Sequence, residues 1–470
     1  MKIAWNKMRG VGLLLLGLAT AGGGRSFAAD INTESFAVLA GSSSATAAGT
    51  AVASPFKDES ASAPAKVVAV EPAIPSGSAC CPVECSPSCA TGILCDNGCY
   101  SGAPGRVWFN GEYLHWWTSG AHLPPMVSTL TGPQETVPVT LFGGDEIRNG
   151  DHDGYRMDFG MWLDCCHCWG IEADYFDVTG RPDGFDSGFS NGYNADGTEH
   201  SFARIVFDPA ATPNLQVNSV AEVGFTVGRI TVQTSDYFQS AGIWLRRQLR
   251  ASEWSTSNCD VNWTDSCART FRLDAIGGYR FARLIDSVDE QDDSFVFNQN
   301  QPNALYQYTY LNSYKTVNNF NGTELGLDGV YTMGRWSLDV VGKVALGFNN
   351  EYVRLYNQEF ININDVVPGT PAAPQNANPT QEFSRNRFAA IPELTVTAGY
   401  QVTDHLKFTV GYDLLYWTAV VRAADQIAVE PTTGYPYGTL VGNYSTLPAF
   451  SFNESHFLAQ GLRLGGEFRF

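Results

Sequence analysis

The sequence predicts an all-β fold: a transmembrane, antiparallel, up-and-down β-barrel that follows a disordered, cysteine-rich leader. Three observations predict it. An export signal opens the chain, apolar and polar residues then alternate in segment after segment, and the last such segment ends on Phe470. In a barrel strand one face meets lipid and the other meets the lumen, which produces this alternation. Aromatic residues make up 13% of the chain, charged residues 16%, and 47 of the 470 residues are glycine, a composition typical of β-rich proteins with many turns.

The export signal occupies the first residues. Three basic residues come first, residues 11–21 form a short apolar run, and Ser26 and Ala28 supply the small residues of a cleavage site. We therefore predict a cleaved signal peptide over residues 1–28. An ordinary first helix of a cytoplasmic domain is the less favoured interpretation. No later stretch of about 18 apolar residues follows, which excludes a helical membrane protein.

The leader that follows has two parts. Residues 29–79 are rich in Ala, Ser, Pro, Gly and Val, and such a low-complexity linker cannot bury enough apolar surface to offset the entropy of ordering. Residues 80–105 contain six cysteines, and we interpret them as a cysteine-rich periplasmic segment. Residues 106–470 are predicted to form the barrel domain.

Alternation is clearest in the last strand. Leu462, Leu464 and Phe468 share one face, whereas Arg463 and Glu467 share the other. One such segment is weak evidence because any half-buried strand looks similar. Six segments of this kind, the last ending on an aromatic residue, favour a membrane barrel. The ten predicted strands are 106–118, 154–164, 169–178, 236–250, 269–284, 320–332, 336–349, 387–401, 406–421 and 457–470.

The connections between these strands alternate in length. Short periplasmic turns, long outer loops and an even strand number are typical of outer-membrane barrels, and the assignment satisfies all three. Two segments, 304–317 and 350–361, could be further strands, so twelve is the alternative count. We interpret the alternating segment 220–233 as a hairpin inside the second outer loop.

The eleven cysteines all fall in the leader or in the short turns of this topology, and export favours disulfides. Pairing within the leader is left open, and the odd total leaves one thiol free or joined to another chain. The cluster at residues 165–168 holds three cysteines and one histidine, so metal binding is the sharper alternative, but no second cluster at zinc spacing accompanies it. We predict no metal and no cofactor. The candidate disulfide cysteines are Cys80, Cys81, Cys85, Cys89, Cys95, Cys99, Cys165, Cys166, Cys168, Cys259 and Cys267.

Charged residues inside the predicted strands are the best functional candidates. A charge facing lipid costs a few kcal/mol near the midplane, so these side chains should face the interior. They could line a polar pore, or they could pair with one another and fill a narrow barrel, and the sequence leaves both interpretations open. The pore-lining candidates are Glu112, Arg156, Asp158, Glu172, Asp174, Arg246, Arg272, Asp274, Arg280, Glu324, Asp328, Asp339, Lys343, Glu393, Lys407, Asp413, Arg463, Glu467 and Arg469.

Other chemistry finds little support. The formal charge of −19 argues against nucleic acid, which needs basic patches. A soluble acidic enzyme remains the alternative interpretation of that charge. No nucleophile elbow, phosphate loop or His-Glu-x-x-His motif occurs, so we expect no enzymatic activity. The acidic run from Asp286 to Asp293 could gather cations, but we favour a solvated outer loop.

Several stretches resemble a family of β-barrel porins found mostly in planctomycete-type bacteria. Residues 107–117 (VWFNGEYLHWW) are similar to its opening strand, and residues 275–281 (AIGGYRF) to its central Gly-aromatic-Arg-aromatic strand. Residues 319–326 (NFNGTELG) resemble its Asn-Phe segment, and residues 391–394 (IPEL) and 421–426 (VRAADQ) its late motifs, with Ala423 where the family often has proline. The resemblance covers roughly residues 106–470. It implies a barrel fold and an outer-membrane location, and no known substrate.

These observations predict a porin-like channel for passive diffusion of small polar solutes. The alternative is a structural, envelope-organising or adhesive barrel with a plugged lumen, cross-linked through its cysteine leader. The expected partners are outer-membrane lipid, the barrel-assembly machinery through Phe470, and further copies of the chain joined by disulfides.

Overall fold

The fold comes from a computed structural model that describes residues 106–470, with gaps at 131–137, 148–150, 165–166, 196, 198, 209–213, 256–267, 298–304, 364–372, 375–379, 430, 435 and 437–448. The predicted signal peptide, the linker and the cysteine segment therefore lie outside the described residues. So do ten of the eleven cysteines. Cys168 is described, and it is buried in the turn that follows the second ring strand.

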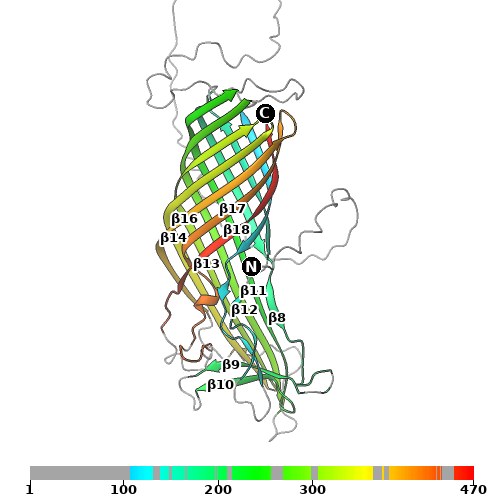
Figure 1. The fold of residues 1–470 in the computed structure, drawn as a ribbon. Coiled ribbons are helices and arrows are strands. Elements are labelled where there is room, and N and C mark those ends of the chain that lie inside the picture. Colours follow the sequence, from blue (N-terminus) through cyan, green and yellow to red (C-terminus); the bar gives the residue numbers. More distant parts are fainter. Residues whose placement is uncertain are drawn as a thin grey trace, which may run out of the picture. The chain divides into compact units, whose positions relative to one another are not determined.

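Ten antiparallel strands form a closed ring, which confirms the predicted fold class (Figure 1). The ring runs in chain order, closes where the last strand pairs with the first, and includes a pairing between β11 and β12. The ring strands are β1 (Val107–Thr118), β6 (Asp151–Trp162), β7 (Trp169–Gly180), β11 (Thr226–Ser255), β12 (Ala268–Phe297), β13 (Leu305–Met333), β14 (Trp336–Ile363), β16 (Thr380–Gln401), β17 (Leu406–Val421) and β18 (Glu454–Arg469). Among the described residues, no helix is both long and apolar enough to cross a bilayer.

Tight turns close one end of the ring, which we call the turn end. Only Gly334 and Arg335 join β13 to β14, and Gly334 has a φ of +59°, a value that glycine adopts without strain. The chain end lies here too, because the Arg106 amide donates to the Phe470 carbonyl over 2.7 Å. The opposite end, the outer end, carries the longer connections.

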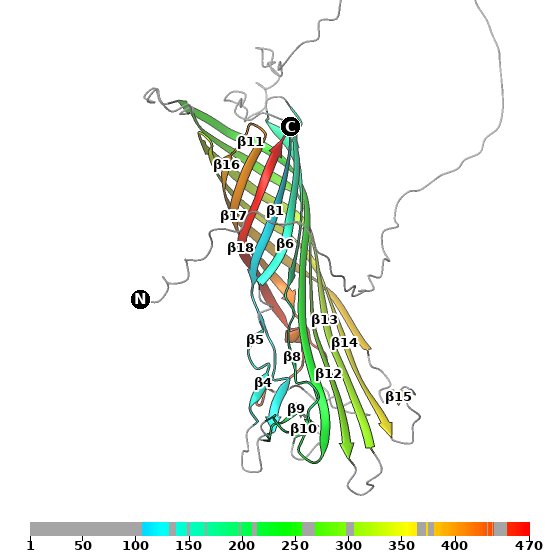
Figure 2. The same ribbon diagram turned by 90° about the vertical axis from the view of Figure 1, so that its right-hand side faces the viewer.

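The wall is much taller on one side of the ring than on the other (Figure 2). We call β11, β12, β13, β14 and β16 the tall wall, because they continue outward beyond their neighbours. Pairing between β16 and β17 stops at Glu393 and Leu415, although β16 begins at Thr380. A short strand, β8 (Asp183–Asp186), pairs with β11 along the tall wall, and β15 (Ala373–Pro374) pairs with β14.

The tall wall corrects three predictions. Residues 305–317 and 350–361 of the two segments are the outer halves of β13 and β14, so the alternative count of twelve ring strands is wrong. Segment 220–233 does turn back on itself, with an antiparallel bridge between Glu222 and Thr226, but residues 226–233 open the ring strand β11 and do not belong to an outer loop. The acidic run lies on β12 and not in a solvated loop: Asp286, Glu290 and Asp292 are buried on its inner face.

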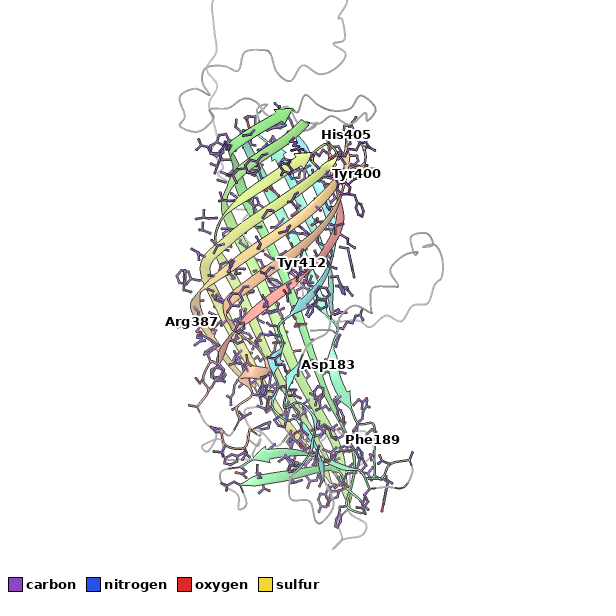
Figure 3. The ribbon with its side chains drawn as sticks, in the orientation of Figure 1. Asp183, Phe189, Arg387, Tyr400, His405 and Tyr412 are labelled. Carbon is purple, nitrogen blue, oxygen red and sulfur yellow. The ribbon has the colours of Figure 1, made fainter. Side chains whose placement is uncertain are left out.

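Apolar side chains on the outside of the ring mark the membrane. On β14 and β16, Trp336 packs against Tyr400 with ring centroids 4.9 Å apart, and Phe348 packs against Phe388 at 6.0 Å. At the usual tilt, the strand from Trp336 to Phe348 spans roughly 28 Å along the barrel axis, close to the apolar band of a membrane barrel. Tyr400 and Tyr412 project outward within this band (Figure 3).

Smaller sheets fill the outer end. Strands β10 (Leu215–Ala221), β9 (Ser201–Phe207), β3 (Val127–Leu130) and β4 (Thr140–Phe142) form one sheet, and β2 (Ala121–His122) pairs with β5 (Glu146–Ile147). Leu123, Phe202, Ile230 and Val288 belong to a buried cluster that joins these strands to the tall wall. The outer end of the ring is therefore packed with protein.

Candidate functional site

The candidate site is the barrel lumen, which the predicted charged residues share. All nineteen lie on ring strands, and every one is buried or half-buried. A strand points alternate side chains to opposite faces, so even spacing within a strand keeps its charges on the inner face. Their pore-lining role stays a prediction. The contacts among these side chains define the lumen. The nineteen residues are Glu112, Arg156, Asp158, Glu172, Asp174, Arg246, Arg272, Asp274, Arg280, Glu324, Asp328, Asp339, Lys343, Glu393, Lys407, Asp413, Arg463, Glu467 and Arg469.

Glu393 lies at the centre of a network that crosses the lumen. Its carboxylate accepts from Arg280 on β12 at 2.5 Å and from Arg156 on β6 at 3.2 Å. Lys343 on the neighbouring β14 lies 3.9 Å away. Strand β16 is four places from β6 and three from β12 in the ring, so these ion pairs join opposite sides of the wall.

Further ion pairs surround this centre. The Glu324 carboxylate forms ion pairs with Arg280 and Lys343, each at 3.3 Å. The Asp174 carboxylate forms one with Arg156 at 2.9 Å. Each of the three carboxylates, Glu393, Glu324 and Asp174, therefore faces at least one base. Buried ion pairs of this kind are costly to break, because the remaining charge stays in a poorly solvated place.

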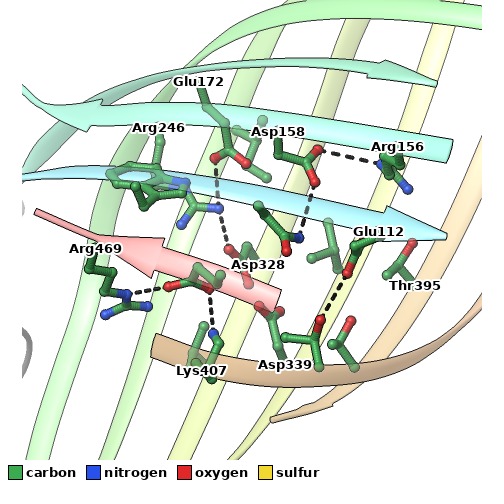
Figure 4. A pocket seen from close by; sticks show the side chains of 18 of the residues that line it. Glu112, Arg156, Asp158, Glu172, Arg246, Asp328, Asp339, Thr395, Lys407 and Arg469 are labelled. Carbon is green, nitrogen blue, oxygen red and sulfur yellow. Dashed lines mark hydrogen bonds and ion pairs between the residues drawn. The ribbon is translucent and has the colours of Figure 1, made fainter. Parts of the chain in front are cut away.

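A charged chamber lies between this network and the turn end (Figure 4). Its volume is about 170 Å³. Arg246 binds Glu172 at 3.1 Å and Asp328 at 2.5 Å, and its guanidinium faces the Trp108 ring at 5.8 Å. Arg463 binds Glu112 at 2.8 Å. The chamber combines fixed charges of both signs with tryptophan surfaces.

The turn between β6 and β7 contributes to the chamber through His167. Arg272 donates to the His167 carbonyl over 2.9 Å, and the imidazole itself is buried. Burial lowers the pKa of His167, and the positive charge of Arg272 lowers it further, so the ring is neutral at pH 7.

An aromatic layer closes the lumen beyond the charged network, and sequence reasoning missed it. Six rings from six strands are at most 1% exposed: Trp116, Phe176, Phe238, Phe320, Trp417 and Phe457. Phe238 is central, with ring centroids 5.1 Å from Phe176, 5.2 Å from Phe457 and 6.1 Å from Trp417. Aromatic contacts of this geometry are favourable beyond the area they bury.

A signal for this layer was available in the sequence. Each ring lies an even number of residues from a charge on its own strand, as Trp116 does from Glu112 and Trp417 from Asp413. Such spacing places ring and charge on the same face. Apolarity alone assigns every apolar residue of a strand to the lipid face, whereas spacing relative to the charges assigns these six rings to the interior.

The chain folds inward at the last four residues of β17, where a bulge separates Trp417 from Val420, and covers the aromatic layer. We call residues 418–429 the inward loop. Ala419 has a φ of +50°, which is strained for a residue other than glycine. The Asn349 amide donates to the Ala419 carbonyl over 2.9 Å, and the Asn318 side chain pairs with the Val421 backbone through both its oxygen and its amide. Two strands of the tall wall therefore hold the start of this loop.

Arg422 fixes the next part of the inward loop. It donates to Asp286 on β12 over 2.6 Å and to the Ser119 carbonyl over 3.1 Å, and it is 2% exposed. The loop continues into a short 3₁₀ helix, η2 (Ala424–Gln426), where Gln426 bonds the Asn453 backbone through both polar atoms of its amide. Polar contacts to three elements thus keep the inward loop in the lumen.

The stretches that carry the family resemblance converge on this closure. Arg280 and Glu393 form the network centre, Phe320 packs against Trp417 at 6.0 Å, and Arg422 anchors the inward loop. Trp116 of the opening strand lies in the aromatic layer. Stretches far apart in the sequence therefore meet at one level of the barrel.

In the described part of the chain, no group of three or more His, Cys, Asp or Glu side chains is placed to hold a metal ion. The cysteine–histidine cluster considered as an alternative is only half described, since Cys165 and Cys166 lie outside the described residues.

Comparison with known proteins identifies one family. The model of the family described as "Putative beta barrel porin-7" matches residues 108–470. No curated protein matches the sequence. Among solved structures, the chain is similar to the outer membrane protease OmpT of Escherichia coli, at 10% identity and a TM-score of 0.34, with 78% of this chain and 97% of that chain covered. It is also similar to the toluene transporter TodX of P. putida (9%, TM-score 0.18, coverage 78% and 91%) and to a FadL homologue of Pseudomonas aeruginosa (8%, TM-score 0.21, coverage 78% and 91%).

Proposed function

Because the chain belongs to the family described as "Putative beta barrel porin-7", as its motifs predict, we propose that it is an outer-membrane barrel whose lumen is sealed at rest. In this proposal the barrel is a structural part of the envelope: it anchors the packed outer end and the leader in the membrane. The observation that carries the proposal is the aromatic layer, in which six rings from six strands are at most 1% exposed.

The energetics support a lumen that is sealed at rest. Exposing one large apolar side chain to water costs about 2–3 kcal/mol, and an open path needs several rings to move together. The charged network below would then lose contacts that join opposite sides of the wall. The inward loop adds a third layer, held to β12, β13 and β14 by Arg422, Asn318 and Asn349.

Passive diffusion of small polar solutes is the second candidate function. The family's description and the charged chamber of about 170 Å³ favour it. In this case the aromatic layer and the inward loop would have to move aside. The inner face carries eleven acidic and eight basic candidates, so such a channel would discriminate weakly between ions of opposite sign.

Planar-bilayer conductance of the purified full-length protein tests the proposal. We expect no unit steps from the wild type, and steady steps from the triple variant Trp116→Ala, Phe238→Ala, Trp417→Ala, because its layer loses three of six rings. The matched control replaces three lipid-facing aromatic residues, Phe348→Ala, Phe408→Ala and Tyr412→Ala, and should stay silent. Steady steps from the wild type would overturn the seal and establish the channel. Circular dichroism of each sample verifies a folded barrel.

We also propose that the leader links barrels to one another. An odd number of cysteines in an exported chain, most of them in the leader, supports disulfides between chains. Isolated membranes run on non-reducing gels should show oligomers that collapse to one band on reduction. A single monomer band without reductant would rule the linkage out.

The proposed function also includes export by a cleaved signal peptide and recognition of Phe470 by the barrel-assembly machinery. It includes no catalytic role.

A further inference from the structure

A cavity of about 1100 Å³ lies at the outer end, between the tall wall and the inward loop. We call it the outer groove. Leu355 on β14 and Phe383 on β16 contribute to one side, Asp425 and Ile427 of the inward loop to a second, and Phe450 before β18 to a third. Its volume is close to the upper limit for small-molecule sites.

Side chains, and not a backbone ladder, close the groove where β16 extends beyond β17. Phe383 stacks on Phe450 with ring centroids 3.9 Å apart, and the Arg385 guanidinium lies 4.2 Å from the Phe452 ring. Glu454 completes the closure by binding Arg387 at 2.8 Å. Side chains can part at this seam without loss of strand pairing, so a small molecule has a route into the groove from the outer end.

The lining selects against anions. Among the described residues that line the groove, Asp425 and Glu454 are acidic and none is Lys or Arg. Apolar and aromatic side chains form the larger part of the rest. Arg385 and Arg387 already pair with Glu454, so Asp425, near His122, is the carboxylate that an anionic amphiphile would meet and that a cation would find complementary. Aromatic faces also attract cations directly.

We propose that the outer groove binds an organic cation with an aromatic or apolar body, its charged group at Asp425 and its body against Phe383 and Phe450. Asp425 is half-buried in the 3₁₀ helix η2 of the inward loop. It lines the groove and lies away from the ion pair between Arg387 and Glu454. Burial raises the pKa of Asp425, and Arg422, His122 and His456 act against this rise. A bound cation would add to their effect and favour the ionised carboxylate. The proposal is independent of whether the lumen conducts.

Equilibrium dialysis of the full-length protein in lipid nanodiscs, with radiolabelled benzyltrimethylammonium as probe, tests this site. We expect saturable binding by the wild type. Asp425→Asn should weaken it by about tenfold, the scale of one partly screened charge interaction. Phe383→Ala should weaken it as well, because the aromatic surface is lost.

Two controls make the result specific to the groove. Asp289→Asn removes an exposed carboxylate from the outside of β12 and should leave binding unchanged. The uncharged isostere neopentylbenzene should bind wild type and Asp425→Asn equally, because it lacks the charge that Asp425 attracts. Heat-modifiable gel migration of each variant confirms a folded barrel. Absence of saturable binding, or equal affinity of wild type and Asp425→Asn for the cation, would overturn the proposal.

Discussion

The Glu393 carboxylate neutralises bases from three strands at once. Arg280, Arg156 and Lys343 all lie within 3.9 Å of it, although their strands are three, four and one places from β16 in the ring. A buried ion pair gains little over an apolar core, but loss of one partner leaves an uncompensated charge. Single changes at this position should therefore have effects far larger than those at exposed charged sites.

Glu393→Gln should lower the free energy of unfolding by about 3 kcal/mol, the lower end of the range for a broken buried pair. The value is at the lower end because Glu324 and Asp174 still face Arg280, Lys343 and Arg156. Equilibrium urea unfolding in lipid vesicles measures it. Asp404→Asn, in the exposed turn before β17, serves as the matched carboxylate-to-amide control, with a change within about 0.5 kcal/mol. Equal effects of the two variants would show that Glu393 has no central role.

Which residues belong to the site could be predicted, and how they pair could not. Arg156, Arg280 and Glu393 were found because a charge within a membrane strand must face inward. Their mutual contact depends on ring closure, which brings β6 and β12 opposite β16. No local pattern carries that information. The aromatic layer was missed for a different reason, since Phe238 and Ile243 are equally apolar and only parity separates the buried ring from the lipid-facing side chain.

Strand positions were predictable at the turn end and not at the outer end. The predicted strand 336–349 begins where β14 begins, but β14 continues to Ile363. Inside the membrane band the outer face is apolar and the inner face polar, which produces alternation. Beyond Phe348 the outward positions include Asn350 and Arg354, so both faces are mixed and the pattern disappears. The strand itself continues because its neighbours still pair with it.

A buried arginine adds an ionic contact between the sheet that holds β9 and the tall wall, beside the apolar cluster that joins them. Arg204 lies 3.5 Å from Glu290 and 3.7 Å from Asp292, and its guanidinium faces the Tyr310 ring at 4.6 Å. Glu290 and Asp292 have no other base among the described ion pairs. Removal of Arg204 would leave two buried carboxylates in like-charge contact.

Arg204→Ala should release the β9–β10 hairpin while the ring stays folded. Local opening that becomes easier by about 1.4 kcal/mol accelerates cleavage by roughly tenfold. Limited proteolysis with mapped cleavage sites checks this. Arg229→Ala, which removes an exposed arginine paired with Asp186, should be cleaved at the wild-type rate. Cleavage of both variants at one rate would contradict an anchoring role for Arg204.

At the scale of the whole molecule, the apolar band divides the wall into a membrane part and an aqueous part. Val340 lies on the outside of β14 between the aromatic pairs, whereas Gln233 lies on the outside of β11 in the tall wall. A charge added within the band meets lipid, and a charge added beyond it meets water. The position of the band is therefore testable by one type of substitution at two sites.

Val340→Arg should cost about 2–4 kcal/mol of unfolding free energy, the cost of a lipid-facing arginine near the midplane. Gln233→Arg should change it by no more than about 0.5 kcal/mol. Unfolding of both variants in lipid vesicles provides the comparison. A small effect at Val340, or a large one at Gln233, would place the bilayer elsewhere along the wall.

The pairing of the first ring strand with the last has a consequence for biogenesis. Trp108 pairs with Arg469, so the two edges that close the ring come from the two extremes of the barrel sequence. Until residues 454–469 have been synthesised, β1 presents an edge of unsatisfied backbone groups. Each such group costs several kcal/mol in hydrocarbon. The nascent chain therefore has no stable half-inserted form, and insertion has to await the synthesis of β18, with the open edge shielded on the way to the membrane.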